Sequence, residues 1–201
     1  MSTEDRNERH RKAMQRRKQI VDEKIAQAQT ERGVFIVITG NGKGKTSSAI
    51  GTLIRTLGHG YKAGLVQFIK GTQDTGEILY LHDDPNLELH QMKTGFTWET
   101  QNREADMAAA RDTWSHALPL LQDPTIQLVV LDEITYMLKY GYLDIDDVLP
   151  AILHRPAHQS VIVTGRNAHR DLMENADTVS EINALKHAFE AGIKAQAGIE
   201  W

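Results

Sequence analysis

A glycine- and lysine-rich run at residues 39–46 carries the clearest chemical signal in this chain. It reads Thr-Gly-Asn-Gly-Lys-Gly-Lys-Thr, and it lies between a β-type segment at 34–38 and a segment at 47–57 whose apolar residues recur at helical spacing before Gly58, a plausible C-cap. Glycines let backbone N–H groups approach a polyphosphate, and the start of a helix adds favourable partial charge. Lys45 supplies a point charge to the phosphates, and the Thr46 hydroxyl is the expected magnesium ligand. We therefore predict a P-loop that binds a nucleoside triphosphate, in preference to a plain strand-to-helix turn.

The loop departs from the usual spacing G-x-x-x-x-G-K-[ST]. That spacing requires glycine at position 39, where this chain has Thr39, and the glycine follows one place later at Gly40. Lys43 adds an extra cation to the turn. We expect this loop to follow the phosphates differently from the loop of an ordinary kinase or GTPase. The expected ATP contacts come from the loop and the helix after it: Gly40, Asn41, Gly42, Lys43, Gly44, Lys45, Thr46, Ser47 and Arg55.

A pair of acidic residues follows a buried strand later in the chain. Four apolar residues at 128–131 precede Asp132 and Glu133, which matches the Walker B pattern. Such a strand brings carboxylates to the carboxyl edge of an open α/β sheet, where ligands bind. We predict that Thr46, Asp132 and Glu133 hold Mg²⁺ (or Mn²⁺), and that Lys45 and Glu133 are catalytic. A second interpretation makes Glu133 the general base that activates water in an ATPase, and these motifs alone leave both open.

The composition limits the classes of protein to which this chain can belong. The chain has 201 residues, 40% hydrophobic and 25% charged, with a formal net charge of −4 and no cysteine. These values are ordinary for a globular enzyme, and they offer no basic field that recruits nucleic acid. Disulfides and thiolate-bound metals are excluded, and no apolar run is long enough to span a membrane. We expect a cytoplasmic enzyme without nucleic-acid or membrane partners.

The order of apolar segments predicts one α/β domain behind an N-terminal arm. Residues 1–32 hold nine Lys/Arg and six Asp/Glu; we expect a disordered tail over 1–12 and a helix over 13–32 that docks on a partner or ligand. Alternating strands and helices over 33–201 predict a P-loop NTPase-like (RecA-like), mostly parallel sheet with helices on both faces. The further expected strands are 65–69, 87–91, 126–131, 160–164 and 178–182, and the further helices are 99–122, 133–140, 144–154 and 169–175.

Several stretches resemble the ATP:corrinoid adenosyltransferases of the CobA/BtuR type. They occur in register from about residue 33 to 199: 39–46, 66–71, 95–100, 131–136, 163–166, 169–172, 176–182, 186–189 and 191–196. One departure is Asn167-Ala168, where glycine and a small residue are expected. Such a departure affects a turn near the site.

The resemblance implies a reaction that few P-loop proteins perform. The Co(I) centre of a reduced corrinoid attacks the ribose C5′ of ATP, and inorganic triphosphate leaves. Asp132 and Glu133 then serve the magnesium ion instead of a water molecule. The resemblance also implies that Phe96 and Trp98 wall the corrinoid pocket, where an apolar ring offers cobalt no axial lone pair. A flavoprotein electron donor and a homodimer are implied as well, and the amphipathic arm fits the latter.

Two other function classes remain as alternatives at this stage. A P-loop ATPase or RecA-like motor yields ADP and phosphate, and partners or nucleic acid usually stimulate it. A nucleotide-binding regulator binds ATP without turnover. The net charge of −4 disfavours the motor, and the complete set Lys45, Thr46, Asp132 and Glu133 disfavours the regulator.

Overall fold

The computed structural model describes residues 3–69, 75–92 and 102–201. The chain divides into two compact units, residues 1–31 and 32–201. Within the described residues, no helix is both long and apolar enough to cross a membrane.

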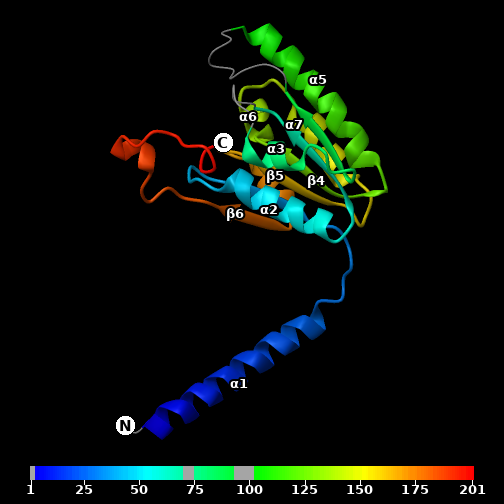
Figure 1. Cartoon of the computed structure of the whole chain (residues 1–201). Helices are drawn as coiled ribbons and strands as arrows, with labels where there is room; N and C mark the ends of the chain where they lie inside the picture. The colour runs from blue at the N-terminus through cyan, green and yellow to red at the C-terminus, as the bar shows by residue number, and fades with distance from the viewer. Residues whose placement is uncertain (1–2, 70–74, 93–101) are drawn as a thin grey trace. The chain divides into compact units, whose positions relative to one another are not determined.

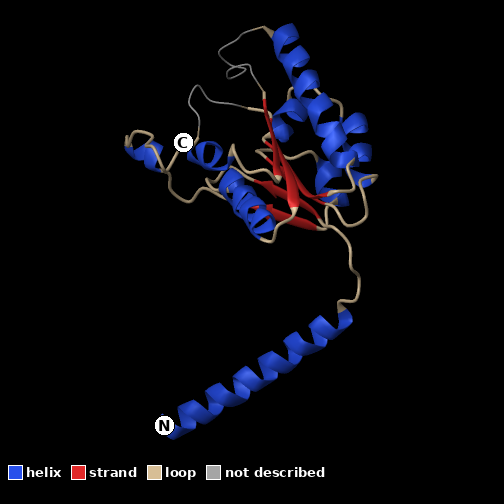
Figure 2. Ribbon diagram, turned by 45° about the vertical axis from the view of Figure 1, so that its right-hand side comes forward, coloured by secondary structure: helices blue, strands red, loops and turns tan. Residues whose placement is uncertain are grey.

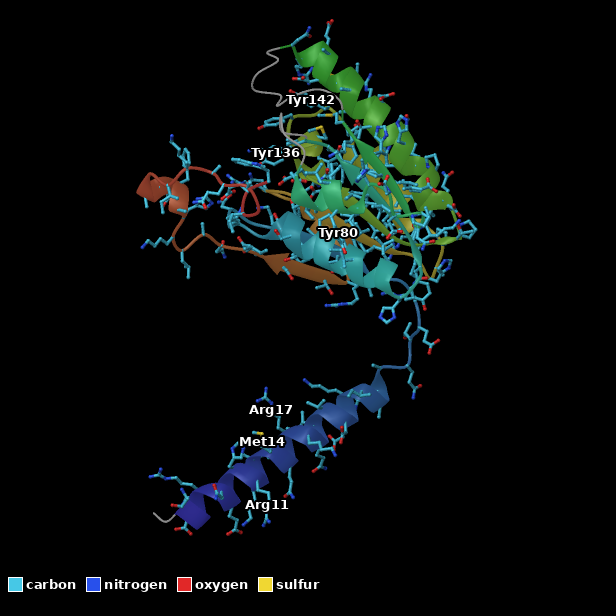
Figure 3. The ribbon with its side chains drawn as sticks, in the orientation of Figure 1. Arg11, Met14, Arg17, Tyr80, Tyr136 and Tyr142 are labelled. Atoms are coloured by element: carbon cyan, nitrogen blue, oxygen red, sulfur yellow. The ribbon has the colours of Figure 1, made fainter. Side chains whose placement is uncertain are left out.

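The first unit contains one long helix, α1, Thr3–Gln27 (Figure 1). The expected disordered tail over 1–12 is therefore wrong from Thr3 onward, and the helix ends five residues before position 32. The stretch contains neither glycine nor proline, and the pair Glu8–Lys12, 2.8 Å apart at a spacing of four, supports a helix. Side chains such as Arg11, Met14 and Arg17 project from it into solvent (Figure 3).

The second unit is built on a six-stranded sheet in the order β3-β2-β4-β5-β1-β6, with every pair parallel (Figure 2). This confirms the predicted α/β fold class. The strands are β1 Phe35–Thr39, β2 Lys62–Gln67, β3 Leu87–Gln91, β4 Ile126–Asp132, β5 Ser160–Thr164 and β6 Thr178–Glu181.

Helices cover both faces of the sheet, as predicted. They are α2 Lys45–Gly58, α3 Gly76–Leu81, α5 Arg103–Gln122, α6 Ile134–Lys139, α7 Ile145–Leu153 and α8 Arg170–Asn175, followed by the 3₁₀ turn η1 Ala188–Ala191. Leu53 of α2 and Ile78 of α3 pack with Leu65 and Val130 on one face. Residues of α5 to α8 pack with the alternate strand residues on the other face, because successive strand side chains point to opposite sides.

Several element boundaries differ from the sequence prediction. β2 begins at Lys62, three residues early: Ala63 packs on the face covered by α2 and α3, and Gly64 leaves room for α5, because a Cβ on Gly64 would lie 2.9 Å from Leu120 Cδ1. Gly58 is the last residue of α2 and not its cap; His59 is the cap, and the left-handed residue is Gly60, with φ +77°. The short elements α3 and η1 were not predicted, since single turns leave no periodic pattern.

Gln159 connects the end of α5 to the start of β4 through hydrogen bonds. Its fully buried side-chain amide donates to three carbonyl oxygens. These belong to Leu120, Asp123 and Ile126, at 2.9, 3.2 and 3.2 Å.

We predict that Gln159→Met lowers the free energy of unfolding by about 1–3 kcal/mol, because buried carbonyls lose their donor. Gln127→Met is the matched control: its amide donates to His158 O on the exposed side, 3.1 Å away, and its cost should stay below about 0.5 kcal/mol. Urea denaturation of both variants measures the difference, and equal midpoints would refute the assignment.

Candidate functional site

A cavity of about 630 Å³ opens at the carboxyl edge of the sheet. Loop residues 41–47 form one wall, and Asp132 and Glu133 at the end of β4 form another. Tyr136 of α6 also contributes (Figure 3). The remaining lining residues are Gln67, Ile69, Thr75, Gly76, Glu77, Arg166, His187, Gly198, Ile199, Glu200 and Trp201. The structure thus gathers the loop and the acidic pair that the sequence had singled out separately.

The loop glycines are required by the chain that follows β6. Gly40 has φ +99°, and a Cβ there would lie 2.4 Å from Ile182 O. Gly42 donates its backbone N–H to the same carbonyl oxygen at 2.6 Å, and a Cβ on Gly42 would also meet Ile182. Gly44, at φ +118°, is needed for its backbone conformation alone.

The displaced glycine has a structural reason. Thr39 is the last residue of β1, and its Oγ1 accepts the backbone N–H of Ala168 at 3.2 Å. A glycine at position 39 would remove that acceptor, so the turn begins at Gly40. The neighbouring departure at Asn167 is also explained: its φ is +53°, a left-handed conformation that asparagine adopts more readily than most residues.

Lys45 is the buried cation of the loop, with 6% of its surface exposed. Its Nζ donates to the carbonyl oxygen of Gly42 at 2.9 Å. Burial lowers the pKa of Lys45, and the nearby Glu133 carboxylate opposes that effect. An ammonium group held this way provides a fixed charge beside the loop amides, which suits an anionic ligand.

Asp132 is the most tightly held carboxylate of the site, 2% exposed. Its Oδ1 accepts from Thr46 Oγ1 at 2.9 Å and from Thr164 Oγ1 at 2.6 Å. Its Oδ2 accepts from Gln67 Nε2 at 3.2 Å. Burial raises the pKa of Asp132, and these hydrogen bonds oppose the rise because they favour the ionised form.

Glu133 adopts a left-handed backbone conformation, φ 60°, that turns the chain from β4 into α6. Its backbone N–H donates to Thr164 Oγ1 at 3.0 Å. Burial, and then the charge of Asp132, raise the pKa of its side chain to about 7. Its Oε2 is buried without a hydrogen-bond partner among the described residues.

This set of oxygens fits a hard divalent cation. The Thr46 hydroxyl and the carboxylates of Asp132 and Glu133 are the kinds of ligand that Mg²⁺ takes. The buried, unsatisfied Oε2 of Glu133 needs a positively charged or hydrogen-bonding neighbour. An ion beside it would meet that need.

The sequence analysis assigned no role in the site to three residues that belong to it. The side chains of Gln67 and Thr164 donate hydrogen bonds to Asp132, and Arg166 lines the cavity. A signal existed for the first two, because each is a polar residue ending a buried strand. On the loop itself, Lys43 Nζ lies 2.7 Å from Glu200 Oε2, so the C-terminal segment contacts the loop.

Other predicted site residues lie elsewhere or outside the description. Gly40 supports the loop but is not among the residues lining the cavity. Arg55 is exposed in the last turn of α2 and does not line the cavity either, so its contact with ATP stays a prediction. Phe96 and Trp98 lie outside the described residues.

Substitution of Gly165 tests the arrangement of side chains around Glu133. A Cβ at this glycine, φ +135°, would lie 2.0 Å from Thr135 Oγ1 and 3.0 Å from Glu133 Oε2. We predict that Gly165→Ala weakens Mg²⁺-dependent ATP binding by about 10- to 100-fold, because it displaces the Glu133 carboxylate, which we expect to bind the ion.

Gly51→Ala is the control for that substitution. Gly51 lies inside α2 with nothing within 4 Å of its would-be Cβ, so this change should leave ATP affinity intact and stabilise the protein by about 0.5–1 kcal/mol. Calorimetric titration with Mg·ATP checks both variants. Unchanged affinity in Gly165→Ala would contradict the proposed geometry.

Comparison with known proteins places this chain in a family. The model of the family described as ATP:corrinoid adenosyltransferase BtuR/CobO/CobP matches residues 31–201, and the model described as cob(I)alamin adenosyltransferase N terminal matches residues 1–25. The corrinoid adenosyltransferase of Escherichia coli and corrinoid adenosyltransferase CobA of Salmonella typhimurium are each 54% identical over 195 residues, 97% of this chain and 99% of theirs. The corrinoid adenosyltransferase of Pseudomonas aeruginosa is 54% identical over 198 residues, 98% of both chains. The chain belongs to the ATP:corrinoid adenosyltransferase family.

Proposed function

We propose that this enzyme transfers the 5′-deoxyadenosyl group of ATP to the Co(I) centre of a corrinoid. Co(I) donates an electron pair to the ribose C5′, and a cobalt–carbon bond forms. The C5′–O5′ bond breaks, its electron pair leaves with inorganic triphosphate, and cobalt becomes formally Co(III). The products are triphosphate and adenosylcobalamin or an adenosylated precursor.

The cavity at the carboxyl edge of the sheet is the observation that carries this proposal. It is lined by the loop residues 41–47, which include Lys45 and Thr46, and by Asp132 and Glu133. Cobalt is itself the nucleophile, so the protein needs no nucleophilic side chain. Its task is to hold C5′ in line and to stabilise negative charge on the leaving group.

The cation ligands have a defined role in this proposal. Thr46, Asp132 and Glu133 would hold Mg²⁺, which when bound neutralises charge on the triphosphate. Asp132 is oriented for this by Gln67 and Thr164. Lys45 acts on the phosphates directly. Glu133 then serves the ion and not a hydrolytic water.

The remaining assignments rest on the family. We propose that Phe96 and Trp98 wall the corrinoid pocket and keep axial ligands from cobalt, which eases reduction of Co(II). We further propose a flavoprotein electron donor, a homodimer, and the cytoplasm as the location, where ATP and reductant are both available. Hydrolysis to ADP and phosphate by a motor is not favoured, because the family match covers the chain from residue 31 to 201.

Substitution of Lys45 tests the stabilisation of the leaving group. We predict that Lys45→Met reduces kcat by about 10²–10³-fold, since a fixed positive charge at the developing anion is lost. Lys62→Met is the matched control, because Lys62 is exposed at the start of β2, the opposite edge of the sheet from the cavity. The assay uses chemically reduced cobalamin as substrate and quantifies both products, triphosphate and adenosylated corrinoid. If Lys45→Met turned over as fast as the control at saturating ATP, the role of Lys45 at the leaving group would be refuted.

Substitution of Trp98 tests the corrinoid pocket. We predict that Trp98→Ala keeps its ATP affinity but loses more than about tenfold in turnover, or about 1.4 kcal/mol of barrier, with cob(II)alamin and a flavoprotein donor. Chemically reduced cob(I)alamin should restore much of the rate, because the reduction step is then bypassed. Equal activity of mutant and wild type in the cob(II)alamin assay would discard the assignment.

A further inference from the structure

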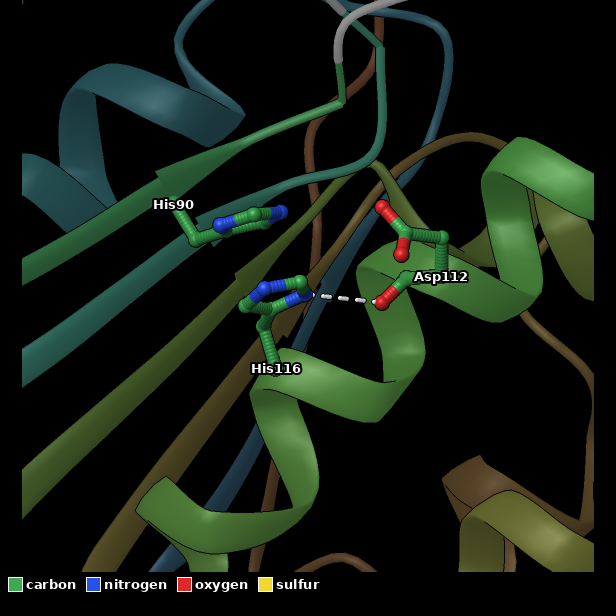
Figure 4. A group of neighbouring side chains, drawn as sticks. All are labelled: His90, Asp112 and His116. Carbon is green, nitrogen blue, oxygen red and sulfur yellow. Dashed lines mark hydrogen bonds between the residues drawn. The ribbon is translucent and has the colours of Figure 1, made fainter.

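Three potential metal ligands meet where the edge strand β3 lies against α5 (Figure 4). They are His90 of β3 and Asp112 and His116 of α5. Their nearest ligand atoms all lie within 4.8 Å of one another. None of the three lines the cavity at the carboxyl edge, so this cluster is separate from the proposed ATP site.

The fold explains why these side chains converge. Asp112 and His116 are four residues apart, so they lie on the same face of α5. In β3, Leu87 and Leu89 pack toward the face covered by α2 and α3. Successive strand residues alternate in direction, so His90 points to the other face, which α5 covers.

A hydrogen bond selects the tautomer of His116. Its Nδ1 lies 2.9 Å from the backbone carbonyl oxygen of Asp112. A carbonyl only accepts, so Nδ1 carries the proton and Nε2 of the neutral ring presents its lone pair. Metal-binding histidines are oriented in this way by a partner on the other ring nitrogen.

The second imidazole lies directly against the first. The ring centroids of His90 and His116 are 3.7 Å apart, and the rings are nearly parallel at 11°. An imidazole coordinates a metal through a lone pair in the plane of its ring, so at least one of these two rings must turn out of the stack for both to reach one ion. Figure 4 shows the Asp112 side chain on α5 beside the two rings. Two imidazole rings and one carboxylate thus lie close together at this place in the fold.

We propose that His90, Asp112 and His116 bind one divalent transition-metal ion of the Zn²⁺, Ni²⁺ or Cu²⁺ class. Imidazole nitrogen suits these ions, whereas Mg²⁺ prefers oxygen ligands only. Asp112 and His116 are exposed and His90 is half-buried, so water completes the coordination. Binding joins β3 to α5 and stabilises the folded chain by mass action. The proposal does not depend on adenosyl transfer.

The test is a titration of the chelator-treated full chain with Zn²⁺ against a competing indicator dye, in a millimolar excess of Mg²⁺ that occupies oxygen-only sites. The wild type should bind one Zn²⁺ per chain saturably. His90→Ala and His116→Ala should each weaken that binding by at least about tenfold. Cu²⁺ loaded into the wild type should show electron paramagnetic resonance couplings to two imidazole nitrogens, and to one in either variant.

His154→Ala provides the matched control among the nine histidines of the chain. His154 is also exposed, and its Nδ1 makes the same contact to a carbonyl four residues earlier, Pro150 O at 2.8 Å, outside the cluster. Its loss should leave Zn²⁺ affinity unchanged. Melting temperatures without metal verify that all variants fold, and Zn²⁺ should raise only those of the wild type and His154→Ala. No saturable Zn²⁺ binding, or equal binding by His116→Ala and His154→Ala, would overturn the proposal.

Discussion

The buried carboxylate of Asp132 is the constraint on which the site depends. A carboxylate removed from water is costly unless donors surround it, and here three side chains supply them. The strand order provides two of these: β2 and β5 flank β4, and the register pairs Gln67 with Asp132 and ends β5 at Thr164. Thr46 comes from the first turn of α2. One carboxylate therefore links the glycine-rich loop, through Thr46, to the carboxyl edge of the sheet, through Gln67 and Thr164.

The loop is shaped as much by distant chain as by its own glycines. Ile182, just beyond β6, accepts the Gly42 amide and fills the space where side chains at positions 40 and 42 would lie. β6 can reach the loop because it pairs with β1 in parallel. Glu200 then pairs with Lys43, so a segment near the C-terminus forms part of the cavity at the carboxyl edge of the sheet. Contacts from distant parts of the chain support the shape of this loop, and preorganisation of this kind is what the proposed stabilisation of the leaving group requires.

Much of the fold was predictable, because buried parallel strands appear as continuous apolar runs and the long helix α5 is rich in alanine. The motifs also identified Lys45, Thr46, Asp132 and Glu133, which share one cavity. The partners Gln67 and Thr164 were missed because local patterns do not reveal which strands become neighbours. The helix over residues 3–12 was missed for a different reason. A highly charged stretch is typical of a disordered tail, but this one contains no residue that breaks a helix. The reason for Thr39 and Asn167 is tertiary, and only the folded chain displays it.

The central claim is that the whole triphosphate leaves from carbon, so the bond that breaks is C5′–O5′. The most direct measurement uses ATP labelled with ¹⁸O at the 5′ bridging oxygen, reduced cobalamin and enzyme, followed by mass spectrometry of both products. Cleavage at carbon places all of the label in inorganic triphosphate and none in the organocobalt product. Label that stays with the nucleoside, accompanied by ADP and phosphate, would mean that a P–O bond is broken and would contradict the proposed chemistry.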